Sequence, residues 1–304
     1  MTEQEQLPPD VMAQLAALDS EITPQLAQAS WALLTPFHEK AGYTAPKIDR
    51  DLAYGDDPRN RLDVHTAGDG AGTGKPVFVF VHGGGFVRGD KHNPGTPQYD
   101  LVGAWAVRRG YVGVTMTYRL APAHVWPAGA EDVATAVRWL QQNIAAYGGD
   151  PDKIVVAGNS AGAVHVASFV AGHGGGDPAS IAGAALLSGI YHIRKPAPGE
   201  PEHVYYGPDP DPAVVSSLPG LLETTTPLLF SVAERDPDRF QQEAAGVVSA
   251  WLSRHGTVPD LVWVEGHNHM STIGSLTVDE TALGTALARF IERHTSTTDK
   301  ETAQ

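Results

Sequence analysis

The stretch KIVVAGNSAG, residues 153–162, joins an apolar segment to a run of small and apolar residues through Ser160. The apolar segment predicts a buried strand, and the run that follows predicts a helix beginning at the turn. A serine in a sharp strand-to-helix turn needs small neighbours, because the strained backbone leaves no room for larger ones. Such a turn lifts the hydroxyl clear of the sheet, beside the N–H groups at the start of the helix. The stretch therefore predicts an α/β fold with Ser160 as a nucleophile, the alternative being a serine that caps a helix.

Apolar segments alternate with helical ones along most of the chain. Strands are predicted at 76–81, 110–118, 153–158, 181–187, 227–233 and 260–264, and helices at 99–109, 130–146, 161–172, 238–254 and 278–293. Most of these strands are apolar throughout, as in a sheet covered on both faces. The alternation predicts a mostly parallel, doubly wound sheet with right-handed crossovers, preceded by an antiparallel pair at 51–54 and 61–66. In such sheets the chemistry lies beyond the carboxyl ends of the strands.

Three segments lie outside this alternation. Residues 1–45 hold two predicted helices, one capped by Asp10 and one beginning at Pro24, which we expect to lie over the core as a small helical cap. Residues 191–220 are rich in proline and aromatic residues and replace an expected crossover helix, so they predict an insertion near the site that forms part of a substrate lid. The core is expected to span residues 46–294, followed by a flexible polar tail at 295–304.

Composition excludes several classes of function. The 304 residues are 42% hydrophobic and 18% charged, which predicts a folded core, and 35 acidic against 21 basic residues disfavour nucleic-acid and anionic-membrane partners. The absence of cysteine excludes disulfides, thiolate metal sites and cysteine nucleophiles. The acidic N-terminus is unlike a secretion signal, and no apolar run approaches the ~20 residues that span a bilayer. We therefore expect a cytoplasmic protein, with no cofactor and no metal, because no His, Asp or Glu cluster has metal-ligand spacing.

A second glycine-rich motif, His82-Gly83-Gly84-Gly85-Phe86, ends the predicted strand at 76–81. Three consecutive glycines let the backbone approach a ligand and direct N–H groups at a developing oxyanion. A flexible turn and a phosphate-binding nest are the alternatives. The phosphate alternative is disfavoured, because the motif has neither a following Lys-Ser/Thr pair nor the G-x-G-x-x-G spacing.

A nucleophilic serine needs a base, and the base needs an acidic partner, in the chain order Ser, Asp or Glu, His for this architecture. Asp236 follows the predicted strand at 227–233, and we prefer it to Glu234, which points to the opposite face, and to Asp238, which suits the cap of the next helix. His267 and His269 both follow the last predicted strand. The spacing from Gly266 favours His269 as the base, and His267 stays open as the alternative.

Together these motifs resemble the α/β-hydrolases, specifically the hormone-sensitive-lipase-like branch of carboxylesterases. The resemblance covers about residues 76–294 and is carried by His82–Phe86, Tyr118–Pro122, Pro127 with Asp132 and Trp139, Gly158–Gly162, Asp236-Pro237 and His269. It implies the α/β-hydrolase fold and a catalytic triad of Ser160, Asp236 and His269. It also implies an oxyanion hole formed by the N–H groups of Gly84, Gly85 and Ala161.

The chain departs from that branch at a few positions. Asn159 stands where the branch usually has Asp, Ala123 where it has Glu, and Met270-Ser271 where it has Gly-Phe. The last of these is similar to the formamidase and feruloyl-esterase-like relatives. The resemblance implies a serine carboxylesterase that hydrolyses small short-chain or aryl esters through an acyl-enzyme. An arylformamidase or amidase with the same triad is the alternative, and a non-catalytic receptor on a hydrolase fold is a third reading.

Aromatic residues predict the walls of an acyl or aryl pocket. The residues chosen for this role are Phe86, Trp31, Tyr191, His192 and Tyr205. Arg119 and Asp132 are expected to form a structural pair, and His165 a core histidine. The expected partner is a small-molecule ester, and a homodimer is left open.

Overall fold

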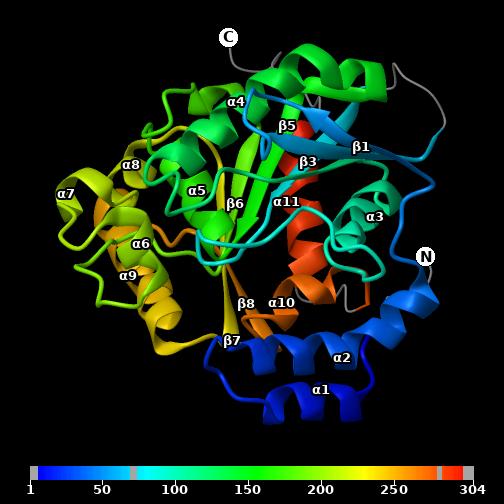
Figure 1. Cartoon of the computed structure of the whole chain (residues 1–304), viewed down its shortest axis with the longest axis horizontal. Coiled ribbons are helices and arrows are strands. Elements are labelled where there is room, and N and C mark those ends of the chain that lie inside the picture. The colour runs from blue at the N-terminus through cyan, green and yellow to red at the C-terminus, as the bar shows by residue number, and fades with distance from the viewer. Residues whose placement is uncertain (1–5, 69–73, 279–282, 297–304) are drawn as a thin grey trace.

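An eight-stranded sheet forms the centre of the protein in the computed structural model, which describes residues 6–68, 74–278 and 283–296 (Figure 1). The strand order is β1-β2-β4-β3-β5-β6-β7-β8, with β1 and β2 antiparallel to their neighbours and β3 to β8 parallel to one another. The strands are β1 (Lys47–Ala53), β2 (Arg61–Thr66), β3 (Lys75–Val81), β4 (Val112–Met116), β5 (Gly149–Asn159), β6 (Gly183–Leu187), β7 (Leu228–Arg235) and β8 (Asp260–Asn268). The predicted α/β sheet is confirmed.

Helices cover both faces of this sheet. The longer ones are α1 (Pro9–Ala17), α2 (Pro24–Ala41), α3 (Asp100–Arg108), α4 (Ala128–Asn143), α5 (Ala161–Val170), α9 (Asp238–His255) and α11 (Thr285–Thr295). The short ones are α6 (Pro201–Tyr206), α7 (Pro212–Val215), α8 (Leu218–Glu223) and α10 (Ser271–Gly274). The last helix was predicted to begin at residue 278, but Val278 lies in a turn and α11 begins at Thr285; residues 279–282 lie outside the described ranges.

The alternation of side chains along β3 shows how the two layers are built. Val77, Val79 and Val81 are buried in a cluster with residues of α4 and α5. Phe78 and Phe80 are buried in a second cluster with residues of α3 and α11. Successive side chains of a strand point to opposite faces, so a solidly apolar strand supplies both clusters at once.

The N-terminal helices α1 and α2 lie side by side at the end of the sheet where β8 leads into α10 (Figure 1). A Cβ atom built at Gly266 would lie 2.4 Å from Met12 Cε of α1, and one at Gly274 would lie 2.7 Å from Leu34 Cδ1 of α2. The expected cap at Asp10 is wrong: α1 begins at Pro9, since proline suits the first helical turn. The division between residues 45 and 46 stays a prediction.

The insertion at 191–220 holds short helices in place of a single crossover helix. It contains α6 and α7 and leads into α8, which contacts both α5 and α9. Its start is held by Glu243 of α9, whose Oε2 accepts hydrogen bonds from the N–H groups of Tyr191 (2.9 Å) and His192 (3.0 Å). None of the described helices has the length and apolarity that crossing a membrane requires.

Four of the buried histidines have a pKa well below the ordinary value. Burial lowers the pKa of His38, His65 and His82 to about 4 and that of His165 to about 3. His165 packs edge-to-face against the Tyr118 ring, with the ring centroids 4.3 Å apart. Near neutral pH these four side chains are uncharged, because the hydration that a charge would lose on burial outweighs the attraction of nearby groups.

These histidines predict an acid-sensitive fold. Their folded-state pKa values lie below the ordinary 6.5, so the unfolded chain binds more protons and stability is lost as pH falls from about 6.5 toward 4. As the pH is lowered from about 6.5 to 4, the free energy of unfolding measured in urea should decrease less steeply for the His165→Phe variant than for wild type. The difference is at most about 1.4 kcal/mol per pH unit, the effect of one proton. Equal slopes would contradict the burial argument.

Candidate active site

Ser160 occupies the tight turn between β5 and α5. Its backbone has φ +56° and ψ −123°, and its N–H donates to the Leu187 carbonyl at 2.9 Å. A Cβ atom at Gly158 would lie 2.4 Å from the carbonyl carbon of Gly162, and one at Gly162 would lie 2.1 Å from the Val81 carbonyl oxygen. Both glycines are therefore required for α5 to begin this close to the sheet. The Ser160 side chain stands at the end of the strand, partly exposed.

The glycine loop after β3 lies directly against this turn. A Cβ atom at Gly83 would come within 3.3 Å of the Ser160 Cβ. Gly84, Gly85 and Phe86 follow with φ values of +135°, +59° and +68°. At Gly84 a Cβ atom would collide with the Arg88 carbonyl, 2.0 Å away. The absence of side chains therefore lets this loop fold tightly on itself at Gly84 and pass close to Ser160 at Gly83.

Asp236 and His269 meet at the carboxyl ends of β7 and β8. His269 Nδ1 lies 2.6 Å from Asp236 Oδ1, and both side chains are buried. The other carboxylate oxygen, Oδ2, accepts hydrogen bonds from the Ala233 N–H and the Ser188 hydroxyl, each at 2.7 Å. The Phe240 ring packs on the imidazole with centroids 4.4 Å apart. The imidazole is thus oriented through Nδ1, and its Nε2 has no hydrogen-bond partner among the described residues.

The alternatives for the acid and the base lie elsewhere. Glu234 accepts a hydrogen bond from the Gly266 N–H at 2.7 Å, and Asp238 lies in the first turn of α9. His267 is buried, with Nδ1 3.0 Å from the Ser271 hydroxyl in its own turn. Of these candidates, Asp236 and His269 are the pair that the structure brings together.

The turn that carries His269 is held by Asn268, which the sequence analysis missed. Asn268 Oδ1 accepts hydrogen bonds from the N–H groups of Met270 (3.0 Å) and Ser271 (2.9 Å). Its Nδ2 donates to the hydroxyl of Ser30 on α2 at 3.1 Å, and both side chains are fully buried. Asparagine commonly forms such turns, but its contact with α2 joins residues 238 positions apart and has no local sequence signal.

Parts of the chain are similar in sequence to known esterases. A family model described as BD-FAE matches residues 62–177. Esterase LipC of Mycobacterium tuberculosis is 40% identical over 42% of this chain and 30% of its own length. Esterase LipQ of the same organism is 32% identical over 62% of this chain and 46% of its own length. The chain therefore spans less than half the length of these curated relatives.

Solved structures match over nearly the whole chain. A hyperthermophilic esterase from the archaeon Pyrobaculum calidifontis superposes with a TM-score of 0.67 at 23% identity, covering 95% of this chain and 98% of that one. The chain has the α/β-hydrolase fold. An esterase from the bacterial hormone-sensitive lipase family superposes with a TM-score of 0.66 at 22% identity, over 94% and 97% of the two chains. The predicted resemblance to that branch is confirmed.

An apolar cluster, which we term the site cluster, spans the region between the glycine loop and His269. It comprises Phe86, Ala121, Ala161, Val164, Ile190, Ile193, Tyr205, Val215 and Phe240. Phe86 and Tyr205 were expected at a pocket wall. Tyr191 lies instead in the main core, with its hydroxyl donating to the Leu186 carbonyl at 3.2 Å, and the His192 residue is exposed.

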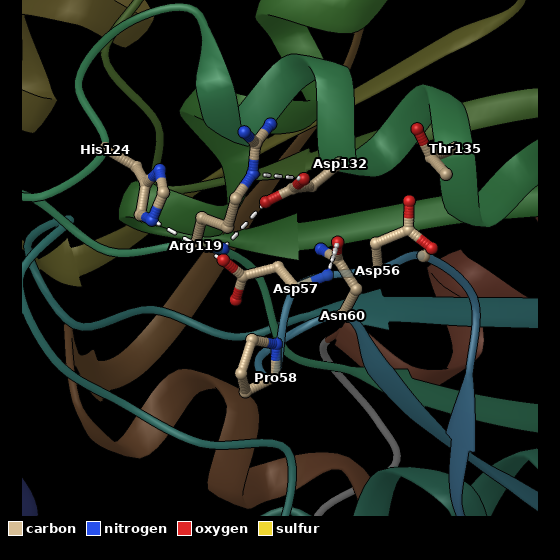
Figure 2. A pocket seen from close by; sticks show the side chains of 9 residues that line it. Asp56, Asp57, Pro58, Asn60, Arg119, His124, Asp132 and Thr135 are labelled. Atoms are coloured by element: carbon tan, nitrogen blue, oxygen red, sulfur yellow. Dashed lines mark hydrogen bonds and ion pairs between the residues drawn. The ribbon is translucent and has the colours of Figure 1, made fainter.

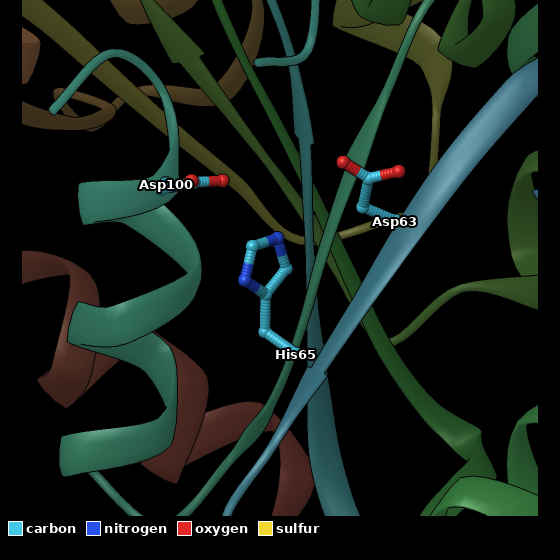
Figure 3. Close-up of side chains that lie close together, drawn as sticks. All are labelled: Asp63, His65 and Asp100. Atoms are coloured by element: carbon cyan, nitrogen blue, oxygen red, sulfur yellow. The ribbon is translucent and has the colours of Figure 1, made fainter. Parts of the chain in front are cut away.

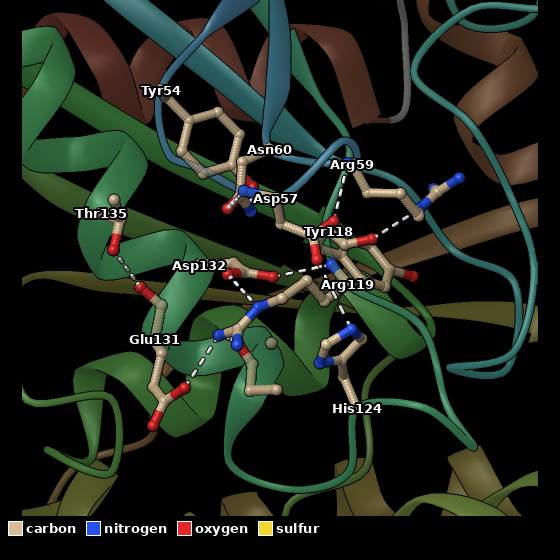
Figure 4. A network of polar contacts seen from close by, with 12 residues as sticks. Tyr54, Asp57, Arg59, Asn60, Tyr118, Arg119, His124, Glu131, Asp132 and Thr135 are labelled. Atoms are coloured by element: carbon tan, nitrogen blue, oxygen red, sulfur yellow. Dashed lines mark hydrogen bonds and ion pairs between the residues drawn. The ribbon is translucent and has the colours of Figure 1, made fainter.

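Two open pockets in the described part of the chain lie away from Ser160, Asp236 and His269. The larger, about 570 Å³, lies between the turn after β1, the segment after β4, and α4 (Figure 2), and its lining includes Asp57, Arg119 and Asp132. Arg119 and Asp132 form the expected pair, with Nε 2.8 Å from Oδ1, within a wider polar network (Figure 4). The smaller pocket, about 290 Å³, places Trp31 against residues 96–98 and outside the site cluster.

A buried group of Asp63, His65 and Asp100 has ligand atoms within 4.8 Å of one another (Figure 3). Its carboxylates already face cations: Arg50 bridges Asp63 and Asp100 at 2.7 Å each, and Lys91 Nζ lies 3.0 Å from Asp63. A metal ion would have to displace cations that already pair with these carboxylates, at the cost of ion pairs that are partly or fully buried. We assign these residues to an ion-pair network that joins β1, β2 and α3.

Ser188, which donates to Asp236, has a φ of +48° and so occupies the left-handed region. Ser188→Ala and Ser188→Gly both remove the hydroxyl, but glycine alone accepts that φ without strain. We expect both variants to be less stable than wild type. The free energy of unfolding should be about 1 kcal/mol lower for Ser188→Ala than for Ser188→Gly. Urea unfolding measures the order, and Ser188→Ala as the more stable variant would contradict the backbone argument.

Proposed function

We propose that this chain is a serine carboxylesterase that hydrolyses small carboxylic esters with short-chain or aryl groups. The observation that carries the proposal is the Asp236–His269 pair, whose imidazole keeps Nε2 unpaired, in a fold that presents Ser160 at a strand-to-helix turn. The esterase names of the relatives support the same reaction class.

In the proposed reaction Ser160 Oγ attacks the ester carbonyl while His269 Nε2 takes the hydroxyl proton. Asp236 holds the imidazole through Nδ1–H, so that Nε2 is the nitrogen that accepts the proton, and it stabilises the imidazolium that forms. The imidazolium then gives the proton to the leaving alcohol as the carbon–oxygen bond breaks. A water molecule, deprotonated by the same nitrogen, attacks the acyl-enzyme and releases the acid.

The oxyanion of each tetrahedral intermediate is assigned to the N–H groups of Gly84, Gly85 and Ala161. The first two belong to the loop that passes Ser160, and Ala161 opens α5 directly after it. Donors fixed in position before the reaction stabilise developing charge without reorganisation, and losing one typically costs about 10²–10³ in kcat. No cofactor takes part in these steps.

The acyl or aryl part of the ester is placed against the apolar site cluster. Two of the five residues expected at its walls, Phe86 and Tyr205, belong to the cluster. The other three, Trp31, Tyr191 and His192, lie outside the cluster and are not part of the proposed pocket. A cytoplasmic location and a homodimer stay predictions from the sequence.

A fluorophosphonate probe tests the nucleophile. The probe forms a covalent bond with an activated serine, so we expect stoichiometric labelling of Ser160, identified by peptide mass spectrometry. Ser160→Ala should fold and remain unlabelled. A folded wild type that binds small esters without labelling or turnover would favour a receptor.

A pair of histidine variants tests the base. His269→Ala should lower the kcat for phenyl acetate by at least about 10³, because no other group is held at Asp236 to take the proton. His267→Ala should keep most of the activity per folded molecule, since His267 bonds within its own turn. The reverse result would exchange the two assignments. Faster turnover of N-formylkynurenine than of phenyl acetate would favour the arylformamidase alternative.

A further inference from the structure

The glycine loop needs support from outside itself. Phe86 has a φ of +68°, a conformation that a residue with a bulky side chain adopts only where its surroundings hold it. Gly84 and Gly85 before it have no side chains to anchor them. Local hydrogen bonds supply part of the support: the Phe86 carbonyl accepts from the Ala121 N–H at 3.0 Å, and the Gly84 carbonyl from the Arg88 N–H at 3.2 Å.

The short helix α6 of the insertion packs directly on this loop. A Cβ atom at Gly85 would lie 3.2 Å from Cβ and Cγ of Pro201, the first residue of α6. One turn later, the Tyr205 ring stacks on the Phe86 ring with centroids 4.5 Å apart and planes only 4° from parallel. Helix α6 therefore packs against two consecutive residues of the loop, Gly85 and Phe86.

Tyr205 is itself fixed to the core. Its hydroxyl accepts a hydrogen bond from the Gly129 N–H at 3.1 Å and lies 3.4 Å from His165 Nδ1. Its carbonyl accepts from the Trp126 N–H at 3.0 Å, and its side chain is 1% exposed. A ring anchored at both ends does not move aside for a ligand, so it suits a support better than an adaptable pocket wall.

We propose that Tyr205 is a positioning residue for the oxyanion hole. Its ring holds Phe86, and through Phe86 the backbone N–H groups of Gly84 and Gly85, at the place where the oxyanion forms. The inference rests on the proposed function and deepens it. The insertion at 191–220 is then part of the catalytic apparatus, and not only a cover over it.

Loss of the stack should affect the transition state more than the bound substrate. The N–H groups of an oxyanion hole are aimed at the developing anion, so a displaced loop lowers kcat with little change in KM. Complete loss of one donor costs about 10²–10³ in kcat, so a partial displacement is expected to cost about tenfold or more. A pocket wall would instead change KM and the preference for acyl length.

The test compares Tyr205→Leu, which removes the stack, with Tyr205→Phe, which keeps the ring. Val204→Ala, at an exposed neighbour on the same helix, is the matched control. With phenyl acetate, and with active sites counted by fluorophosphonate labelling, Tyr205→Leu should lower kcat about tenfold or more with KM within about twofold. Its inhibition constant for a trifluoromethyl ketone, which forms an oxyanion on Ser160, should weaken by the same factor. Val204→Ala should stay within about threefold of wild type, and Tyr205→Phe, which keeps the ring but loses its hydroxyl anchor, should fall between wild type and Tyr205→Leu.

The outcomes separate the possibilities. An unchanged kcat in Tyr205→Leu, or a change in KM alone, would overturn the positioning role. If Tyr205→Leu does not fold, Phe86→Leu removes the same stack from the other side and is expected to give the same kcat and inhibitor losses. A wild type that is neither labelled nor active would overturn the proposed function, whereas an active wild type with an unaffected Tyr205→Leu would overturn only this inference.

Discussion

The close passage of backbone at Gly158 and Gly162 is the constraint on which the site depends. A Cβ atom at either position would lie 2.4 Å or less from a backbone atom of the neighbouring element. Because those atoms are missing, α5 begins against β3 and β5, and Ser160 stands beside Gly83 at the end of the sheet. Any larger residue would displace the helix and the hydroxyl with it, since a packed interior cannot absorb such an overlap.

The reactive groups lie on loops, and segments added to the sheet hold those loops in place. The turn of His269 is held through Asn268 by Ser30 of α2, and the loop containing Phe86 is held by Tyr205 of α6. Loops have few internal contacts and are placed by the scaffold around them. The N-terminal helices and the insertion therefore pack against the loops that carry the candidate site.

Sequence patterns predicted the sheet and the candidate acid and base well, and the pocket poorly. Asp236 follows one strand and the segment of His267 and His269 the next, and parallel strands bring their carboxyl ends to one edge, so chain order predicted that Asp236 would approach one of the two histidines. No comparable rule predicts from the sequence which aromatic side chains line a pocket. Tyr191 and Tyr205 belong to the same insertion, yet one packs in the main core and the other on Phe86, because the paths of the short helices decide it.

The sequence by itself determined the alternation of strands and helices, the strained turn at Ser160 and the glycine loop, because apolar periodicity and the absence of side chains act over a few residues. Only the tertiary structure decided that His269 and not His267 meets Asp236, that Ser188 donates to this carboxylate, and that α2 and α6 support the site. Those contacts join residues far apart in the chain, and their geometry depends on how whole elements pack.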